Sequence, residues 1–335
     1  MKSFITLFLC FLSCQFFFAK ESEITVYNEQ SGIKLAGTLA VPDTKSPKAL
    51  FVFASGSGAQ NRDEEIMGLR PFKVLSDVLI NEGYGVLRMD DRGVGQSEGV
   101  FETATLADFT SDAVSAVKHL KNLYPDIRVG ILGHSQGGQV AVRAAANNNA
   151  DFIVTLAGPA WSGDSLVMSQ CRALAVATTG SWPNESLERK LLDIAKSNIP
   201  DFTVRILLTA ELSNTLGDIA KMPQVQEQIY NQISPLVTPM YRDLLRYNPA
   251  DDISSVKVPW LALNGDKDLQ VLVKNLETIK DLNPNAVTVI IPDHNHLFQP
   301  AITGLPTEYP IAGQSPSDMT IEILVNELNK LLIPE

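Results

Sequence analysis

The chain has few cysteines, and they are unevenly distributed. Of its 335 residues only three are cysteine, and Cys10 and Cys14 both lie within the first twenty residues. Without that segment Cys171 is the only cysteine, which excludes an intrachain disulfide. Such a protein has to rely on its hydrophobic core. A chain of this length with 45% apolar residues can bury a sizeable core, as one large domain with an insertion or as two smaller domains.

Basic residues are also in the minority. The chain holds 27 Lys and Arg against 38 Asp and Glu, which gives a net charge of −11. A strongly acidic protein repels a phosphate backbone, so we do not expect nucleic acid among its partners. The sequence contains no block of like charges and no internal repeat.

One apolar run stands apart from the rest of the sequence. A lysine precedes the run Phe4–Phe18, and Ala19 is followed by the polar stretch KESE. This pattern predicts a secretory signal peptide over residues 1–19, and hence an exported protein, secreted or periplasmic. A retained membrane anchor is the alternative, but the run is shorter than the roughly 20 residues of a spanning helix. A lipoprotein signal ending at Cys14 fits less well, because Phe11 departs from that pattern.

Short apolar runs recur through the rest of the chain and alternate with helix-like stretches. Residues 23–42 contain two predicted strands joined by the turn NEQSG, which predicts an antiparallel hairpin. Four later runs are apolar on both faces, as in a buried parallel sheet, and lie at residues 49–55, 84–89, 128–133 and 152–158. Two more strands are predicted after the insertion, at residues 258–265 and 286–292. Amphipathic stretches predict helices at residues 105–123, 136–148, 271–282 and 317–332. This order predicts an α/β fold, a mostly parallel sheet with helices on both faces.

The alternation stops between Pro159 and Ala250. Amphipathic stretches at residues 185–196 and 235–247 predict a mainly helical insertion, while residues 203–210 fit a strand or a helix. The insertion should leave and rejoin the sheet at its carboxyl edge. We therefore expect it to cover that edge as a cap and to form one wall of a pocket.

The chain after the signal peptide is thus expected to have three parts. They are a first core part, the helical cap and a second core part, at residues 20–158, 159–250 and 251–335. Large apolar side chains of the cap are candidates for lining the pocket, with core packing as the alternative. They are Trp161, Met168, Trp182, Met222 and Met240.

The clearest chemical signal is a serine between glycines, placed between a predicted strand and a predicted helix. Residues 133–137, Gly-His-Ser-Gln-Gly, match the pattern G-x-S-x-G. Glycines are needed there because a sharp strand-to-helix turn leaves no room for side chains beside the serine. Ser135 is then held exposed and strained, and the N–H of Gln136 points into the same space. Ser135 is therefore the candidate nucleophile, with a plain glycine-rich turn as the alternative.

A serine nucleophile needs a base, and the sequence has only four histidines. His119 lies on the polar face of a predicted helix, which indicates a solvated side chain. His134 should point away from its neighbour Ser135. His294 and His296 follow the last predicted strand, in a loop that can lean over the edge of the sheet where the serine stands. The residue pattern leaves both of them open as the base.

The base in turn needs a carboxylate that orients it. The loop LNGDKDLQV follows the penultimate predicted strand and offers Asp266 and Asp268. Because the carboxyl ends of parallel strands share one edge of a sheet, this loop should lie close to the serine and the histidines.

Together these motifs resemble those of the α/β hydrolases, and in particular the bacterial serine esterases and acyl hydrolases with a helical cap. The resemblance covers nearly all of the chain after the signal peptide, and the order Ser, Asp, His is typical of that fold. The family's acid lies in a G-x-x-D segment, here residues 265–268, which selects Asp268. Its histidine belongs to a stretch like NHLF, which selects His296. The stretch DDRGVGQS resembles a family loop in which Asp90 and Arg92 would fix loops.

The resemblance also implies an oxyanion hole with two N–H donors. Gln136 supplies one, and the loop after the third predicted strand supplies the other. The family has H-G-x-G in that loop, where this chain has Ser55-Gly56-Ser57-Gly58. The donor is a backbone group, so serine in place of histidine need not abolish it. We expect the N–H of Ser57, with that of Gly56 as the alternative.

The function implied by the resemblance is that of an exported serine hydrolase acting on carboxylic esters through an acyl-enzyme. Its partner would be a small-molecule ester, and no metal ion or organic cofactor is implied. A peptidase or thioesterase with the same triad is one alternative, because esters, thioesters and amides pass through the same intermediate. A non-catalytic binding protein on a hydrolase fold is the other. The sequence leaves the oligomeric state open.

Overall fold

The computed structural model describes residues 19–43 and 46–333. Of the predicted signal peptide, residues 1–18 lie outside the described residues, so its cleavage stays a prediction. Within the described part of the chain, no helix is both long enough and apolar enough to cross a membrane.

The centre of the molecule is one sheet whose strands run in the order β1-β2-β4-β3-β5-β6-β7-β8. β1 pairs with β2 and β2 with β4 in antiparallel fashion, and all the other neighbours are parallel. The predicted α/β fold is therefore confirmed, including its N-terminal hairpin. The strand bounds are β1 Ala19–Asn28, β2 Ile33–Pro42, β3 Leu50–Ala54, β4 Gly85–Met89, β5 Val129–His134, β6 Ile153–Leu156, β7 Trp260–Gly265 and β8 Val287–Ile291.

Helices cover both faces of the sheet, and each face has its own buried cluster. α1 (Pro71–Asn81) and α11 (Asp318–Leu332) pack on one face. α2 (Leu106–Leu123), α3 (Gln136–Ala146), α9 (Ala250–Ser255) and α10 (Lys274–Leu282) pack on the other. α2 begins at a capping box formed by Thr105 and Asp108. The sequence analysis missed two of these core helices, α1 and the short α9.

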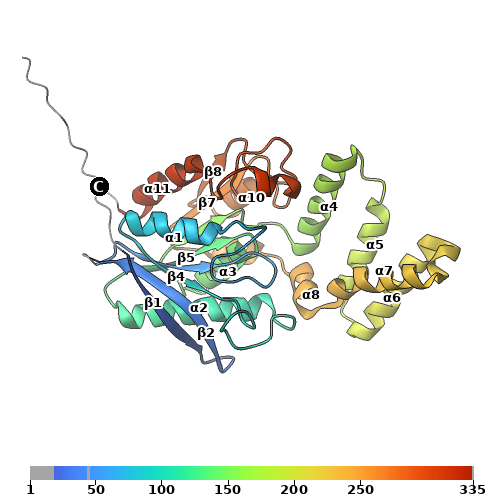
Figure 1. Cartoon of the computed structure of the whole chain (residues 1–335), viewed down its shortest axis with the longest axis horizontal. Coiled ribbons are helices and arrows are strands. Elements are labelled where there is room, and N and C mark those ends of the chain that lie inside the picture. Colours follow the sequence, from blue (N-terminus) through green and yellow to red (C-terminus); the bar gives the residue numbers. More distant parts are fainter. Residues whose placement is uncertain (1–18, 44–45, 334–335) are drawn as a thin grey trace, which may run out of the picture.

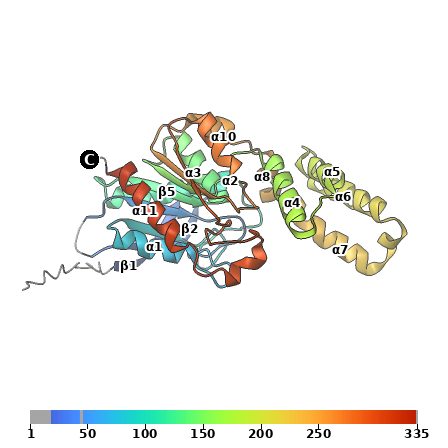
Figure 2. The same ribbon diagram turned by 90° about the horizontal axis from the view of Figure 1, so that it is seen from above.

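Between β6 and α9 the described chain forms only helical elements, which we call the insertion. It consists of α4 (Gly163–Thr179), α5 (Glu185–Lys196), α6 (Asp201–Leu216), α7 (Pro223–Ile233) and α8 (Pro239–Arg246), with 3-10 turns at Gly217–Lys221 and Ser234–Val237. The ambiguous residues 203–210 belong to α6, whose buried Val204, Leu208 and Leu212 recur every four residues. α5, α6 and α7 project away from the sheet on one side of the molecule (Figures 1 and 2).

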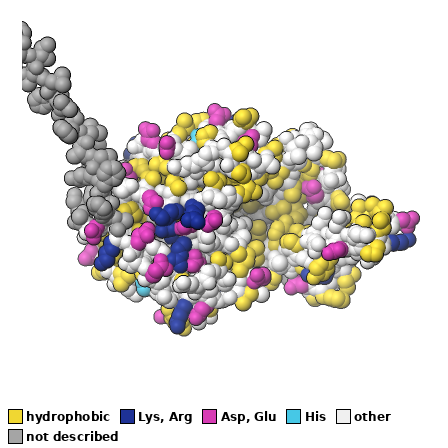
Figure 3. Space-filling model, viewed as in Figure 1, with side chains coloured by type: hydrophobic (Ala, Val, Ile, Leu, Met, Phe, Trp, Pro, Cys, Tyr) yellow, Lys and Arg dark blue, Asp and Glu magenta, His cyan; other side chains and the backbone are white. Residues whose placement is uncertain are grey.

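The two ends of the insertion meet beside the sheet. The N–H of Gly163 donates to the carbonyl of Tyr247 at 2.9 Å, which joins the start of α4 to the residue after α8. The carboxylate of Asp243 in α8 accepts from the N–H of Leu106 at 2.9 Å, at the first turn of α2. A hollow lined with apolar side chains separates the core from the insertion in the space-filling view (Figure 3).

Candidate active site

Ser135 occupies the tight turn between β5 and α3 that the sequence predicts. Its backbone has φ +51°, in the left-handed region that is costly for a serine. A β-carbon on Gly133 would lie 2.0 Å from the carbonyl oxygen of Gly137, and one on Gly137 would lie 2.0 Å from that of Ala54. Neither position can hold a larger residue, so both glycines are required for this turn.

His296 and Asp268 lie together at the same edge of the sheet. Nδ1 of His296 lies 2.7 Å from Oδ2 of Asp268, which is only 2% exposed. Oδ1 of Asp268 accepts from the N–H groups of Gln270 and Val271 at 2.8 and 2.9 Å. With both oxygens engaged, the carboxylate is fixed in orientation and in turn fixes the imidazole.

The neighbouring acid and histidine have different partners. Asp266 is exposed, and its Oδ1 accepts from the N–H of Asp293 at 2.7 Å, which ties the loops after β7 and β8 together. His294 is buried, with Nδ1 at 2.6 Å from the carbonyl of Pro292 and Nε2 at 2.7 Å from Oγ of Ser317. Both therefore support loops and do not contact the Asp268–His296 pair.

Ser135 and His296 both line a cleft of about 560 Å³ between the core and the insertion. The core contributes the loops after β3, β5, β7 and β8, and the insertion contributes residues of α4 and α8. Met240 of α8 lines the cleft, as the sequence analysis considered. Trp161, another of the candidates, is not among the lining residues, and its indole donates to Oγ1 of Thr278 in α10 at 2.9 Å.

The loop after β3 is held by two carboxylates. Asp91 accepts from Oγ of Ser55 at 2.7 Å and from the N–H of Gln60 at 3.0 Å. Glu64 accepts from the N–H of Gly56 at 2.6 Å. The N–H of Gly56, the alternative oxyanion donor, is thus already occupied.

The N–H groups of Ser57 and Gln136 have no hydrogen-bond partner among residues 19–43 and 46–333. Both residues line the cleft beside Ser135. This arrangement leaves two unpartnered donors on the cleft, at the positions that the sequence analysis names. Their role in holding an oxyanion stays a prediction.

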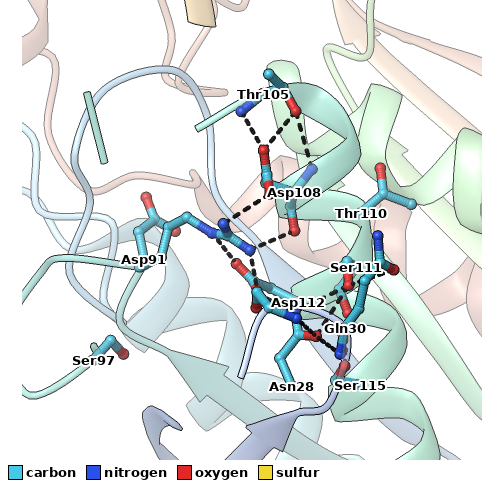
Figure 4. Close-up of polar contacts among 12 residues, drawn as sticks. Asn28, Gln30, Asp91, Ser97, Thr105, Asp108, Thr110, Ser111, Asp112 and Ser115 are labelled. Carbon is cyan, nitrogen blue, oxygen red and sulfur yellow. Dashed lines mark hydrogen bonds and ion pairs between the residues drawn. The ribbon is translucent and has the colours of Figure 1, made fainter. Parts of the chain in front are cut away.

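Two charged residues of the stretch DDRGVGQS form ion pairs beneath this loop. Arg62 contacts Asp90 at 2.8 Å, and its guanidinium outweighs the effect of burial to hold the pKa of that carboxyl below its ordinary value. Arg92 contacts Asp112 at 2.7 Å and Asp108 at 3.0 Å. Figure 4 shows these two aspartates on the first turns of α2. Asp112, on the polar face of α2, is therefore buried against Arg92.

Sequence reasoning missed Glu64 and assigned no contacts to His134. Glu64 is fully buried, and its Oε1 lies 2.9 Å from Nδ1 of His134. His134 contacts the triad loop, with Nε2 at 3.1 Å from the carbonyl of His296. Burial alone would lower the pKa of His134, and the Glu64 carboxylate outweighs it and raises that pKa. No local pattern marks Glu64, because its partner lies 70 positions along the chain.

Comparison with known sequences points to one family. The family described as serine aminopeptidase, S33, matches residues 69–274, more than half of the chain. Esterase EstD of Thermotoga maritima is 27% identical over 83% of this chain and 60% of its own length. Human monoglyceride lipase is 34% identical over 32% of this chain and 34% of its own length. The chain thus spans less than two thirds of these relatives.

Solved structures show the same fold. An esterase from Pyrococcus furiosus matches with a TM-score of 0.57 at 18% identity, over 93% of this chain and 92% of its own. Est1E from Butyrivibrio proteoclasticus, solved with ferulic acid bound, matches with a TM-score of 0.55 at 18% identity, over 92% and 98%. At 18% sequence identity these matches show the fold alone. The chain belongs to the serine aminopeptidase S33 family and has the α/β-hydrolase fold.

Proposed function

We propose that the protein is an exported serine hydrolase that cleaves carboxylic esters through an acyl-enzyme intermediate. The observation that carries the proposal is the joint placement of Ser135 and His296 on one cleft, with His296 bonded to the buried Asp268. The relatives named as an esterase and as monoglyceride lipases favour an ester over other acyl compounds. Export rests on the signal peptide expected over residues 1–19.

In the proposed mechanism Ser135 attacks the ester carbonyl while Nε2 of His296 takes the proton from its hydroxyl. Asp268 holds Nδ1 of His296 protonated and stabilises the imidazolium that forms. The N–H groups of Gln136 and Ser57 donate to the oxyanion of the tetrahedral intermediate. His296 returns the proton to the departing alcohol. Water then attacks the acyl carbon while His296 takes its proton. The bond to Ser135 breaks, His296 returns the proton to the serine oxygen, and the carboxylic acid is released.

The chemistry of the cleft favours a neutral substrate. Among the residues that the structure describes, its lining contains no lysine or arginine, and its one carboxylate, Glu64, is fully buried. Apolar side chains of both parts of the molecule dominate the lining, among them Ile66, Leu166, Met240 and Leu297. An aminopeptidase would have to bind a free ammonium group, and the cleft offers no exposed carboxylate for it. An ester with an apolar acyl chain fits this lining better.

A substrate panel tests the proposal. The purified protein would be offered p-nitrophenyl esters of increasing acyl length, an acyl thioester and amino-acid anilides, with a fluorophosphonate probe as a separate measure of a reactive serine. We expect ester hydrolysis to exceed the other reactions and the probe to label Ser135. Absence of both turnover and labelling would favour a binding protein. A higher kcat/KM for the anilides would favour a peptidase.

A further inference from the structure

A buried acid and a buried histidine connect the two loops that serve the candidate site. Glu64 is 0% exposed and His134 is 5% exposed. On one side Oε1 of Glu64 accepts from the N–H of Gly56, next to the expected oxyanion donor Ser57, at 2.6 Å. On the other side Nε2 of His134 lies 3.1 Å from the carbonyl of His296. One chain of hydrogen bonds thus runs from the oxyanion loop to the triad histidine.

The hydrogen bonds require the pair to hold a shared proton. The carbonyl of His296 can only accept, so Nε2 of His134 must carry a proton. A proton must also lie between Nδ1 of His134 and Oε1 of Glu64, which are 2.9 Å apart. The pair is therefore either a carboxylate with an imidazolium or a carboxylic acid with a neutral imidazole. In both forms its net charge is zero, which lowers the cost of burying it.

Burying Glu64 in this conformation costs free energy that an apolar side chain packed at the same place would not. Glu64 has φ +52°, a left-handed conformation that is unfavourable for a glutamate. Its second oxygen, Oε2, is buried without a hydrogen-bond partner among the described residues. Strained and incompletely paired polar groups of this kind are concentrated at functional sites.

We propose that Glu64 and His134 form a positioning pair that holds the oxyanion loop and the His296 loop at a fixed separation for the ester hydrolysis proposed above. The inference rests on that proposed function. Neither residue contacts the reacting atoms in this assignment. Glu64 acts through Gly56, which fixes the position of the neighbouring Ser57 N–H. His134 acts through the backbone of His296, which fixes the position of the imidazole. Both groups are thereby held around the same substrate carbon.

The pair should confer a dependence on pH. Loss of the shared proton would leave the lone pair of Nδ1 facing the Glu64 carboxylate, which breaks the connection. The Glu64 carboxylate raises the pKa of His134 against the opposing effect of its burial, and Asp268 acts in the same direction. The other titratable groups nearby are His296, whose ring centroid lies 4.8 Å from that of His134, and Asp91. The kcat of the wild type should therefore fall as the pH rises above the pKa at which the pair loses its shared proton.

The decisive variant is Glu64→Gln, with Glu65→Gln as its matched control. Glu65 is the next residue, is exposed and pairs with Arg70 at the surface. A glutamine at position 64 can accept from Gly56 but cannot share a proton with His134. A misplacement of about 1 Å can cost about 100-fold in rate, so we expect kcat to fall by about 10- to 100-fold with KM nearly unchanged. We also expect the alkaline decline of kcat to disappear in Glu64→Gln and to persist in Glu65→Gln.

A second variant covers the case in which Glu64→Gln does not fold. His134→Gln removes the same shared proton from the other side, and thermal unfolding shows which variants are folded. The double variant should be no slower than the slower single variant, because both changes break one connection. If wild type hydrolyses esters and a folded variant matches Glu65→Gln in kcat and in pH profile, the pair has no positioning role. If wild type hydrolyses no ester, it is the proposed function that fails.

Discussion

The carboxyl edge of the sheet and the far end of the insertion are built in opposite ways. At the sheet edge hydrogen bonds join Asp268 to His296 and Glu64 to His134. β5 and β7, which lead into the site, are buried along their whole length. In the insertion, seven large apolar side chains between residues 202 and 230 remain exposed, with Phe202 at 74%. Its own buried clusters are small.

This contrast indicates a division of roles. The sheet edge holds its groups by hydrogen bonds that fix both distance and angle, as acid–base chemistry requires. The insertion contributes side chains of α4 and α8 to the cleft through apolar contacts, which discriminate weakly and adapt to different chains. Substitutions at the sheet edge should therefore change the rate of the chemical step, and substitutions in the insertion should change the choice of substrate.

The largest effect is expected for Ser135→Ala. The change removes the nucleophile, and a triad knockout in related chemistry costs on the order of 10⁶ in kcat. Ester turnover and fluorophosphonate labelling should both be lost. Thermal unfolding should change little, because the side chain lies at the tip of a turn. Substantial turnover by the folded variant would contradict the proposed mechanism.

His296→Ala should have a similar effect on kcat, and His294→Ala should act on stability. His296 is the proposed base. His294 instead supports the chain through Pro292 and Ser317, and loss of a buried hydrogen-bonding side chain costs about 1–3 kcal/mol. Initial rates and melting temperatures of the two variants would be compared. A lower kcat for folded His294→Ala than for His296→Ala would reverse the assignment.

Asp268→Asn should lower kcat by roughly 10⁴, the size of effect seen when a triad acid is replaced by its amide. Asn can no longer hold Nδ1 of His296 protonated. Asp266→Asn is the matched control, because its oxygen can still accept from the N–H of Asp293. We expect the control to retain most of its activity. Equal losses in both variants would show that neither carboxylate orients the base.

Smaller, substrate-dependent effects are expected in the insertion. Met240→Ala enlarges the cleft, whereas Phe202→Ala and Trp161→Ala alter side chains outside it. A contact of methylene size is worth about 1–3 kcal/mol, or roughly 10- to 200-fold. The ranking of acyl lengths by kcat/KM should change for Met240→Ala alone. An unchanged ranking in all three variants would mean that the insertion does not form the acyl pocket.

The strands and the nucleophile turn could be predicted from the sequence because their signals are local. The apolar runs mark the buried strands, and the glycines around Ser135 reflect clashes within one turn. The choice of Asp268 and His296 over their neighbours came from the family resemblance, and the structure brings these two side chains into contact.

The connection between the loops could not be predicted, because it depends on distant residues. His134 lies 70 positions from Glu64 and 162 positions from His296. A glutamate in a polar loop shows no periodicity, and nothing local predicts that it is fully buried. Asp91 is similar: its neighbour Asp90 belongs to a recognisable motif, but only the fold brings Asp91 beneath the loop that follows β3.

The smallest expected effect concerns the stability of the sheet edge, where Asp91 sits. Burial raises the pKa of Asp91 from 3.8 to about 7. Between these values the folded protein keeps a proton that the unfolded chain has released, so this contribution to stability falls as the pH rises. Asp91→Asn removes the titration. Its amide can still donate to Oγ of Ser55 while its oxygen accepts from the N–H of Gln60.

The melting temperature of wild type relative to Asp91→Asn should therefore decline from about pH 4 to pH 7 and level off above. In a protein of this size 1 kcal/mol corresponds to about 2–4 °C, so the trend is measurable. Asp281→Asn, an exposed change at the end of α10, is the control and should show no such trend. Parallel curves for all three proteins would mean that Asp91 stays ionised in the folded state. The loop after β3 would then be held by a charged carboxylate, and its anchoring would not weaken with pH.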